Sequence, residues 1–166
     1  MNKTKINATI VADSINPQGD RLISVLCTFP RIILAEVNKH RMLSSNTSSS
    51  RAIPFNKMLA SIENDPFIPS AFQKQHSGMQ GTEYWIGEDH ITRVENRKKA
   101  ISRAIISAKE EHSLGVTKQL VNRHLEPHMW TTMLITGSKE GWDNFHSLRN
   151  PIYEIDLDNL DKLKDV

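Results

Sequence analysis

Alternating apolar and polar positions predict three strands. Residues 5–15 and 21–29 are rich in β-branched side chains, and residues 16–20, Asn-Pro-Gln-Gly-Asp, have the composition of a turn. The two stretches are therefore predicted to form a hairpin. Residues 129–138 are also predicted to form a strand, because they are rich in Thr, Ile and Met and contain a Trp.

Helices are predicted over most of the remaining chain. Ile33, Val37 and His40 share one stripe, and Gly115 closes a long amphipathic stretch. Residues 67–90 have the Pro, Gly and polar content of a long surface loop. Helices are predicted over residues 30–43, 52–65, 94–115, 116–127 and 141–150. The order β-β-α-α-α-α-β-α predicts an α+β fold, a mixed sheet with packed helices, since no βαβ unit alternates along the chain.

Length and charge narrow the class of protein. The 166 residues suit one domain, and no apolar run is long enough to span a bilayer. Residues 151–166 hold five acidic and two basic side chains, a net charge of −3, which leaves +5 on residues 1–150. A mildly basic body favours a small phosphorylated ligand over a nucleic acid. With a single cysteine, Cys27, and no signal-peptide pattern, we expect a cytoplasmic protein that binds no membrane.

Residues 39–51, Lys-His-Arg-Met-Leu-Ser-Ser-Asn-Thr-Ser-Ser-Ser-Arg, concentrate anion-binding groups after the first predicted helix. Hydroxyls and backbone amides of a serine-rich turn can cradle phosphate oxygens, and Arg51 can bind them with two parallel hydrogen bonds. The alternative is a solvated serine-rich loop preceded by basic residues that the helix dipole favours. Spacing alone does not decide between these two readings.

This stretch resembles the signature of the flavin-dependent thymidylate synthases, which is Arg-His-Arg, seven residues, Ser, and Arg two positions later. Here it runs from Lys39-His40-Arg41 to Ser49 and Arg51, with Lys39 in place of the first Arg. The change keeps the charge but loses the planar guanidinium. Residues 29–54 resemble the phage-type branch of the family especially closely.

A second block strengthens the resemblance. Family members carry an Arg four residues before a Pro, a spacing that Arg123 and Pro127 match, and an Asn five residues before an Arg, which Asn144 and Arg149 match. The blocks lie in the family's order and span about residues 20 to 150. Members of this family are α+β homotetramers that bind FAD across subunits and reduce it with NADPH. With methylenetetrahydrofolate they methylate dUMP at C5.

The resemblance assigns roles residue by residue. Lys39, His40, Arg41, Asn46 and Asn144 would contact FAD, and Glu36, Ser49, Ser50, Arg51, Arg123 and Arg149 would contact dUMP. Glu36 stands where many members carry a Gln. Because a carboxylate repels a phosphate, we expect Glu36 to orient the base or to pair with Lys39 or His40.

The chemistry that the resemblance implies needs no covalent protein residue, since the flavin carries the hydride. Cys27 lies in a predicted buried strand, so we interpret it as a core residue rather than a nucleophile. His124, Glu126 and His128 suggest a metal cluster, but Pro127 interrupts the helix that would align them and no further ligand is evident. We therefore expect no metal.

The resemblance ends at Asn150. The sequence predicts a thymidylate synthase-like domain over residues 1–150 and a divergent acidic tail over residues 151–166, so that the family's C-terminal part is missing. Tyr153-Glu154-Ile155 is either a remnant of the family's Gln-x-Glu-Ile element or part of an unrelated reading frame, and we favour the latter. Two functions stay open. The first is an enzyme, active alone or with a separately encoded remainder, which would act in the host cytoplasm if it is phage-encoded. The second is a non-catalytic fragment that binds a nucleotide or flavin.

Overall fold

The computed structural model describes residues 5–78 and 81–149. Its four strands are β1 (Asn7–Ile15), β2 (Arg21–Pro30), β3 (Ser44–Thr47) and β4 (Trp130–Ser138), in the spatial order β1-β2-β4-β3. The longer helices are α2 (Phe55–Asn64), α3 (Gly87–Ser113) and α5 (Lys139–Arg149). Short helical segments complete the chain: η1 (Arg31–Ile33), α1 (Leu34–Val37), α4 (Lys118–Val121), η2 (Asn122–His124) and η3 (Glu126–His128).

The predicted α+β class is confirmed, and the hairpin, the last strand and the last helix lie where they were expected. The expectation of a mixed sheet is corrected, because all three described strand pairs are antiparallel. The hairpin turn depends on Asn16, whose side-chain oxygen accepts from the amides of Gln18 and Asp20 at 3.0 and 2.8 Å. Gly19 takes φ +94°, which favours a residue without a side chain.

Two predicted helices are much shorter than expected. The helix predicted over 30–43 ends at Val37, and the one predicted over 116–127 is divided into α4, η2 and η3. Leu43 lies in the apolar layer under the sheet, so the chain leaves the helix to bring this side chain inward. Pro127 has no amide proton to continue a helix and lies in the 3-10 turn η3.

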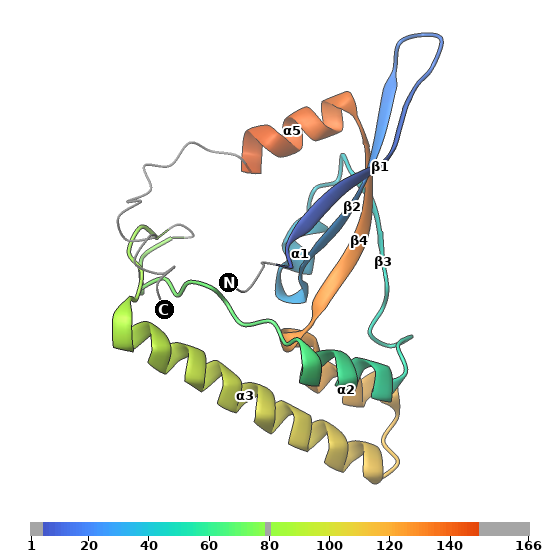
Figure 1. Ribbon diagram of the computed structural model, residues 1–166. Helices are drawn as coiled ribbons and strands as arrows, with labels where there is room; N and C mark the ends of the chain where they lie inside the picture. Colours follow the sequence, from blue (N-terminus) through green and yellow to red (C-terminus); the bar gives the residue numbers. More distant parts are fainter. Residues whose placement is uncertain (1–4, 79–80, 150–166) are drawn as a thin grey trace.

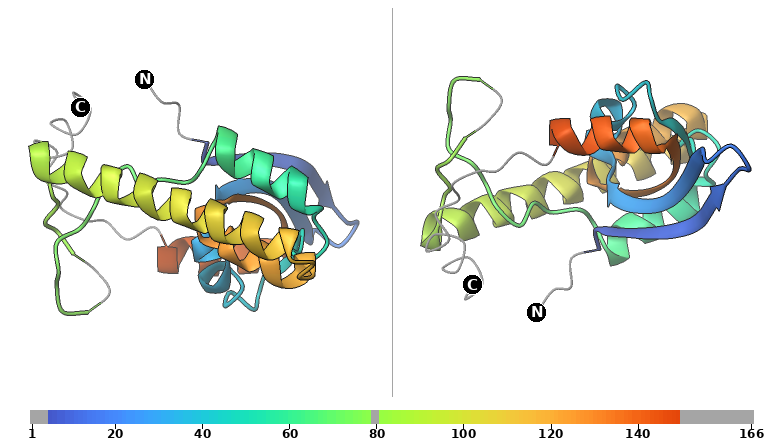
Figure 2. Two further views of the ribbon diagram at one scale, coloured as in Figure 1. Left: turned by 90° about the horizontal axis from the view of Figure 1, so that it is seen from below. Right: turned by 90° about the horizontal axis from the view of Figure 1, so that it is seen from above.

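One face of the sheet is covered by α1 and α5 (Figure 2). Phe29, Met133 and Ile135 are buried there, and Leu34 and Trp142 pack against them. Cys27 packs against the same cluster and is half-buried, so its assignment to the core is confirmed in part. On the opposite face, Leu22, Leu26 and Leu134 are 49%, 40% and 39% exposed.

A second apolar cluster joins the helices below the sheet (Figure 1). Its fully buried members include Met58 and Ile62 from α2, Ala108 from α3, and Val121 and Leu125 from the following segments. This packing fixes α4, η2 and η3 beside the first residues of β4. The serine-rich segment after β3 passes along the same border between the two clusters.

Candidate functional site

The serine turn, residues 48–51, is held by side chains from two other parts of the chain. Arg31 donates from Nη1 to the Ser48 carbonyl at 3.1 Å. Asn122, which is completely buried, donates from Nδ2 to the carbonyls of Ser50 and Ile53 at 2.8 and 2.9 Å. The turn is therefore held against the helical layer by these hydrogen bonds, while Ser48, Ser49 and Arg51 remain exposed to solvent.

The three predicted substrate residues of the turn differ in exposure. Ser49 and Arg51 are exposed, whereas Ser50 is only 1% exposed and its hydroxyl has no hydrogen-bond partner among the described residues. Arg51 donates from Nη2 to Gln119 Oε1 at 3.3 Å, which steadies the guanidinium and leaves its other donors free. Ser49 and Arg51 can therefore reach a ligand directly, whereas Ser50 is buried and its carbonyl is held by Asn122.

Arg31 and Glu126 form an ion pair next to the turn that sequence reasoning missed. Arg31 Nη2 lies 3.2 Å from Glu126 Oε1, and the two side chains are 12% and 20% exposed. The other carboxylate oxygen of Glu126 accepts from Arg123 Nη1 at 2.7 Å. One carboxylate thus joins η1, which precedes α1, to η2 beyond α4. The three-residue spacing of Arg123 and Glu126 could have indicated their contact from the sequence, but nothing in the sequence indicated the contact with Arg31.

The environment of Glu126 keeps it ionised. Burial alone raises its pKa, but the neighbouring Ser50 hydroxyl, the hydrogen bond from Arg123 and the charge of Arg31 together hold the pKa below its usual value. Oε1 still has no hydrogen bond of good geometry among the described residues. The carboxylate therefore carries a full negative charge between two guanidinium groups.

These residues border a cleft of about 430 Å³ between α1 and the η2–η3 segment. Its wall includes Arg31, Arg123, Glu126 and Pro127, and on the α1 side Asn38. The cleft is open, and its lining combines these polar and charged side chains with the apolar residues Ile32, Leu34 and Ala35. A small anion with an apolar body fits this distribution.

A second group of predicted residues meets at α5. Arg149 donates from Nε to His40 Nε2 at 2.9 Å, and the His40 ring packs edge-on against Phe145 with centroids 4.8 Å apart. Burial, and then the positive charge of Arg149, lower the pKa of His40. His40, a predicted FAD residue, therefore contacts Arg149, a predicted dUMP residue. This contact is separate from the one that Arg123 makes with Glu126.

The other predicted FAD residues are exposed. Lys39 and Arg41 follow α1, Asn144 lies on α5, and Asn46 lies on the edge strand β3 opposite Leu134, on the open face of the sheet. Within residues 5–78 and 81–149, the side chains of Lys39 and Arg41 form no ion pair. Exposed cations without internal partners suit the diphosphate of a dinucleotide, so the donor set fits FAD.

Glu36 is exposed on α1. In the part of the chain that the structure describes, its carboxylate pairs with neither Lys39 nor His40. Its expected role in orienting the base stays a prediction.

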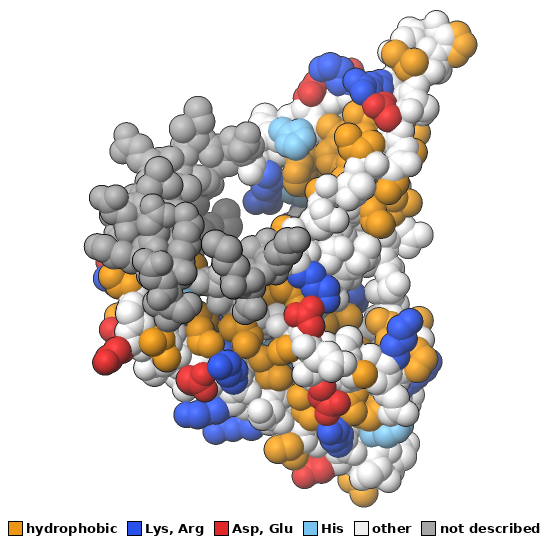
Figure 3. Space-filling model, in the orientation of Figure 1, with side chains coloured by type: hydrophobic (Ala, Val, Ile, Leu, Met, Phe, Trp, Pro, Cys, Tyr) orange, Lys and Arg blue, Asp and Glu red, His pale blue; other side chains and the backbone are white. Residues whose placement is uncertain are grey.

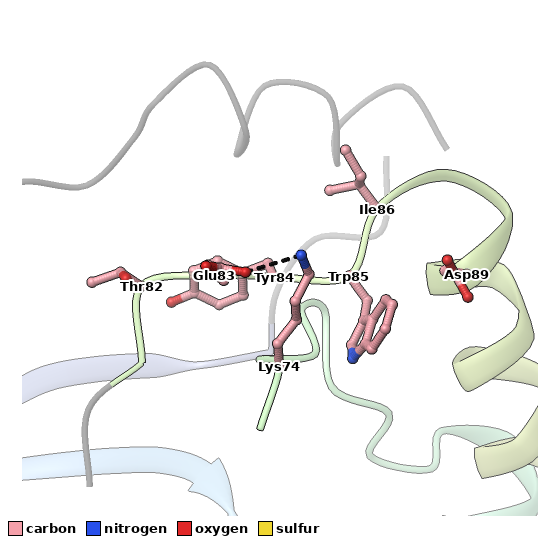
Figure 4. Close-up of a pocket in the computed structure, with 7 residues that line it drawn as sticks. All are labelled: Lys74, Thr82, Glu83, Tyr84, Trp85, Ile86 and Asp89. Carbon is pink, nitrogen blue, oxygen red and sulfur yellow. Dashed lines mark hydrogen bonds and ion pairs between the residues drawn. The ribbon is translucent and has the colours of Figure 1, made fainter. Parts of the chain in front are cut away.

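A separate cleft of about 510 Å³ lies in the loop before α3 (Figure 4). Trp85 stacks on the Arg93 guanidinium at 3.7 Å and faces Lys74 at 5.5 Å, and Lys74 pairs with Glu83 at 3.0 Å. The indole of Trp85 is thus in contact with two of the protein's own cations. None of the predicted site residues borders this cleft.

His124, Glu126 and His128 do not converge. His124 pairs with Glu111 on α3 at 3.0 Å, and Glu126 turns to the arginines. Among the described residues no group of three potential metal-binding side chains comes together.

Within the part of the chain that the structure describes, no helix has the length and apolar character needed to cross a bilayer. Figure 3 shows basic and acidic side chains mixed over the helical layer.

Comparisons with known proteins show the fold. No family model matches the chain, and no curated protein matches it in sequence. Among solved structures, the chain is similar to the UMP/dUMP methylase PolB from Streptomyces cacaoi bound with 5-Br UMP, with a TM-score of 0.67 and 14% identity over 87% of this chain and 76% of that one. A second structure of PolB, bound with 5-Br dUMP, gives a TM-score of 0.59 and 15% identity over 76% of this chain and 53% of that one. The chain therefore has the fold of a dUMP methylase structure and spans about half the length of the second neighbour.

Proposed function

We propose that the chain belongs to a flavin-dependent thymidylate synthase, which methylates dUMP at C5 with methylenetetrahydrofolate and NADPH. Two independent findings support this proposal. The motifs around Lys39–Arg51 and Arg123–Arg149 resemble that family, and the fold is similar to that of PolB, a UMP/dUMP methylase.

One observation carries the proposal. Arg51 and Arg123 are 72 positions apart in the sequence, yet the turn of Arg51 and the segment of Arg123 pack together through Asn122 and Arg31. The family motifs treat these residues as parts of one nucleotide site. Since a solvated loop would have no reason to be fixed beside η2, the packing favours a binding role for the turn.

The charges suit a nucleoside monophosphate. Arg31 and Arg123 contribute two positive charges to the cleft and Glu126 one negative charge, so its lining carries a net +1, and Arg51 adds a further positive charge on the neighbouring serine turn. A phosphate monoester is close to a dianion at neutral pH. Arg51 and Arg123 would bind its oxygens, and the apolar residues of the cleft lining, such as Leu34, would pack against the uracil.

FAD would lie against Lys39, Arg41 and Asn144, whose exposed side chains are chemically suitable donors, while Asn46, on the open face of the sheet, would contact the FAD of another copy. When bound, the flavin supplies the hydride chemistry of the reaction. The protein's own part is to neutralise the diphosphate, hold the uracil in place and exclude water. Because Arg149 contacts His40 rather than the cleft of Arg123, we infer that a complete site draws on more than one copy, as a homotetramer would provide.

The second candidate is a fragment that binds flavin or nucleotide without turnover, because the sequence diverges from the family after Asn150. Titration of FAD and dUMP into the purified chain, together with complementation of a thymidine auxotroph, tests both functions. Rescue of growth supports the enzyme, and binding of both ligands without rescue supports the fragment. A folded chain that binds neither ligand would contradict both.

A further inference from the structure

Glu126 is the link between two arginines that come from distant parts of the chain. It lies 3.2 Å from Arg31 and 2.7 Å from Arg123, and it is one-fifth exposed. Arg31 in turn donates to the Ser48 carbonyl at 3.1 Å and to Thr131 at 3.4 Å. A single carboxylate therefore determines where Arg123 lies relative to the serine turn.

The contacts leave Arg123 free on one side. Among residues 5–78 and 81–149, Glu126 contacts Arg123 through Nη1 alone; the Arg123 side chain is 53% exposed and borders the cleft. A guanidinium has five N–H donors in a rigid fork, so its unoccupied edge can bind two oxygens of one anion. Without Glu126, Arg123 would be a long exposed side chain with many rotamers, and binding would have to order it.

Arg31 is in the opposite situation. Its side chain is only 12% exposed, and its donors are directed to Ser48, Thr131 and Glu126. Arg31 is thus an anchor for Glu126 rather than a free anion-binding group. The arrangement places the exposed guanidinium of Arg123 outside and the largely buried guanidinium of Arg31 inside, with the carboxylate between them.

We propose that Glu126 is a positioning residue for phosphate recognition, which orients Arg123 so that its free edge and the serine turn bind the 5′-phosphate of the nucleotide together. This inference rests on the proposed function and adds to it the residue that selects a phosphate monoester over the uncharged nucleoside. The role is unusual for an acidic residue, since a carboxylate repels the anion that it helps to bind.

Glu126 repels the phosphate by its charge but positions Arg123 to bind it, and Glu126→Gln tests which of these two effects is larger. Removal of a negative charge next to the cleft would tighten dUMP binding if simple Coulomb attraction dominated. If positioning dominates, the neutral amide holds Arg123 less firmly, and we expect dUMP affinity to fall by roughly tenfold despite the gain in positive charge. Binding of deoxyuridine, which has no phosphate, should change much less. Glu126→Asp, which keeps the charge but reaches less far, should recover part of the loss.

The experiment is calorimetric titration of dUMP and of deoxyuridine into the full chain with FAD present. Glu111→Gln is the matched control, because Glu111 pairs with His124 on the same segment at 3.0 Å but does not border the cleft. Thermal unfolding of every variant reports on the fold. Unchanged or tighter dUMP binding by Glu126→Gln overturns the proposal, as does an equal loss for dUMP and deoxyuridine. Failure of both Glu126 variants to fold also overturns it, and wild-type protein that binds no dUMP removes the proposed function itself.

Discussion

Asn122 offers the strongest test of how the serine turn is held. It is completely buried, and its amide nitrogen donates to the carbonyls of Ser50 and Ile53 at 2.8 and 2.9 Å. Asn122→Ala removes both hydrogen bonds and leaves a small cavity, with at least one carbonyl buried without a donor. We expect the turn to loosen and the whole domain to lose stability, because residues 48–53 pack directly on the helical layer.

The magnitude follows from these contacts. Two lost hydrogen bonds contribute about 1 kcal/mol each, and a carbonyl left without a partner adds about 1 kcal/mol or more, so the free energy of unfolding should fall by about 2 to 4 kcal/mol. Loss of the Asn122 side-chain oxygen, which has no partner among the described residues, offsets a part of this. For a chain of this length the unfolding midpoint should drop by about 5 to 12 °C.

Denaturant unfolding of wild type, Asn122→Ala and Asn122→Asp measures the effect. Asn122→Asp keeps the volume but replaces the donor with oxygen, so a comparable loss in that variant assigns the effect to hydrogen bonding rather than to the cavity. Asn64→Ala is the control, since Asn64 is exposed at the end of α2 and should change stability by no more than about 0.5 kcal/mol. A loss below about 1 kcal/mol in both Asn122 variants would refute the idea that Asn122 holds the turn.

Three further predictions address the predicted site residues and the cysteine. Arg51→Ala should weaken dUMP binding by about ten- to a hundredfold in calorimetry and change FAD binding much less, whereas Arg51→Lys should recover only part; equal affinities in wild type and Arg51→Ala would refute the contact. Because the pKa of His40 is lowered from about 6.5, its contribution to stability is complete above that value and is lost as the pH falls through the lowered pKa. Unfolding midpoints between about pH 5 and pH 8 should therefore fall more steeply on the acid side in wild type than in His40→Asn, and parallel curves would contradict this. Cys27→Ser should lower stability, because a half-buried hydroxyl needs a partner, but should preserve any turnover; lost turnover with an unchanged fold would indicate a thiolate mechanism.

Local sequence predicted the elements whose signals are strong by themselves. The hairpin of β1 and β2 combines β-branched runs with a turn, and α3 has sustained helical periodicity closed by Gly115 at φ +82°. In contrast, β3 was missed because Ser44–Thr47 has little strand propensity. This strand exists through its backbone pairing with β4, a partner more than eighty residues away.

The limits of the site prediction have the same physical origin. The family resemblance selected Arg51 and Arg123, of which Arg123 borders the cleft and Arg51 contacts Gln119 one helical turn before Arg123. It could not identify Asn122 or Glu126, because a polar residue inside a predicted helix has no local sign that it is buried against a distant turn. The early end of α1 was also not predictable, since it depends on the entry of Leu43 into the layer beneath Gly137.

The central position of β4 has a consequence for protein synthesis. Both neighbours of β4 in the sheet are made long before it, since β2 ends at Pro30 and β3 at Thr47 while β4 begins at Trp130. On the ribosome, the nascent chain can form the first hairpin and long helix α3, but β3 has no strand to pair with. Asn122 in η2, which holds the serine turn, is also absent until that segment emerges from the ribosome. We therefore expect ribosome-bound chains that stop before β4 to bind no nucleotide, and productive folding to wait for nearly the whole described sequence.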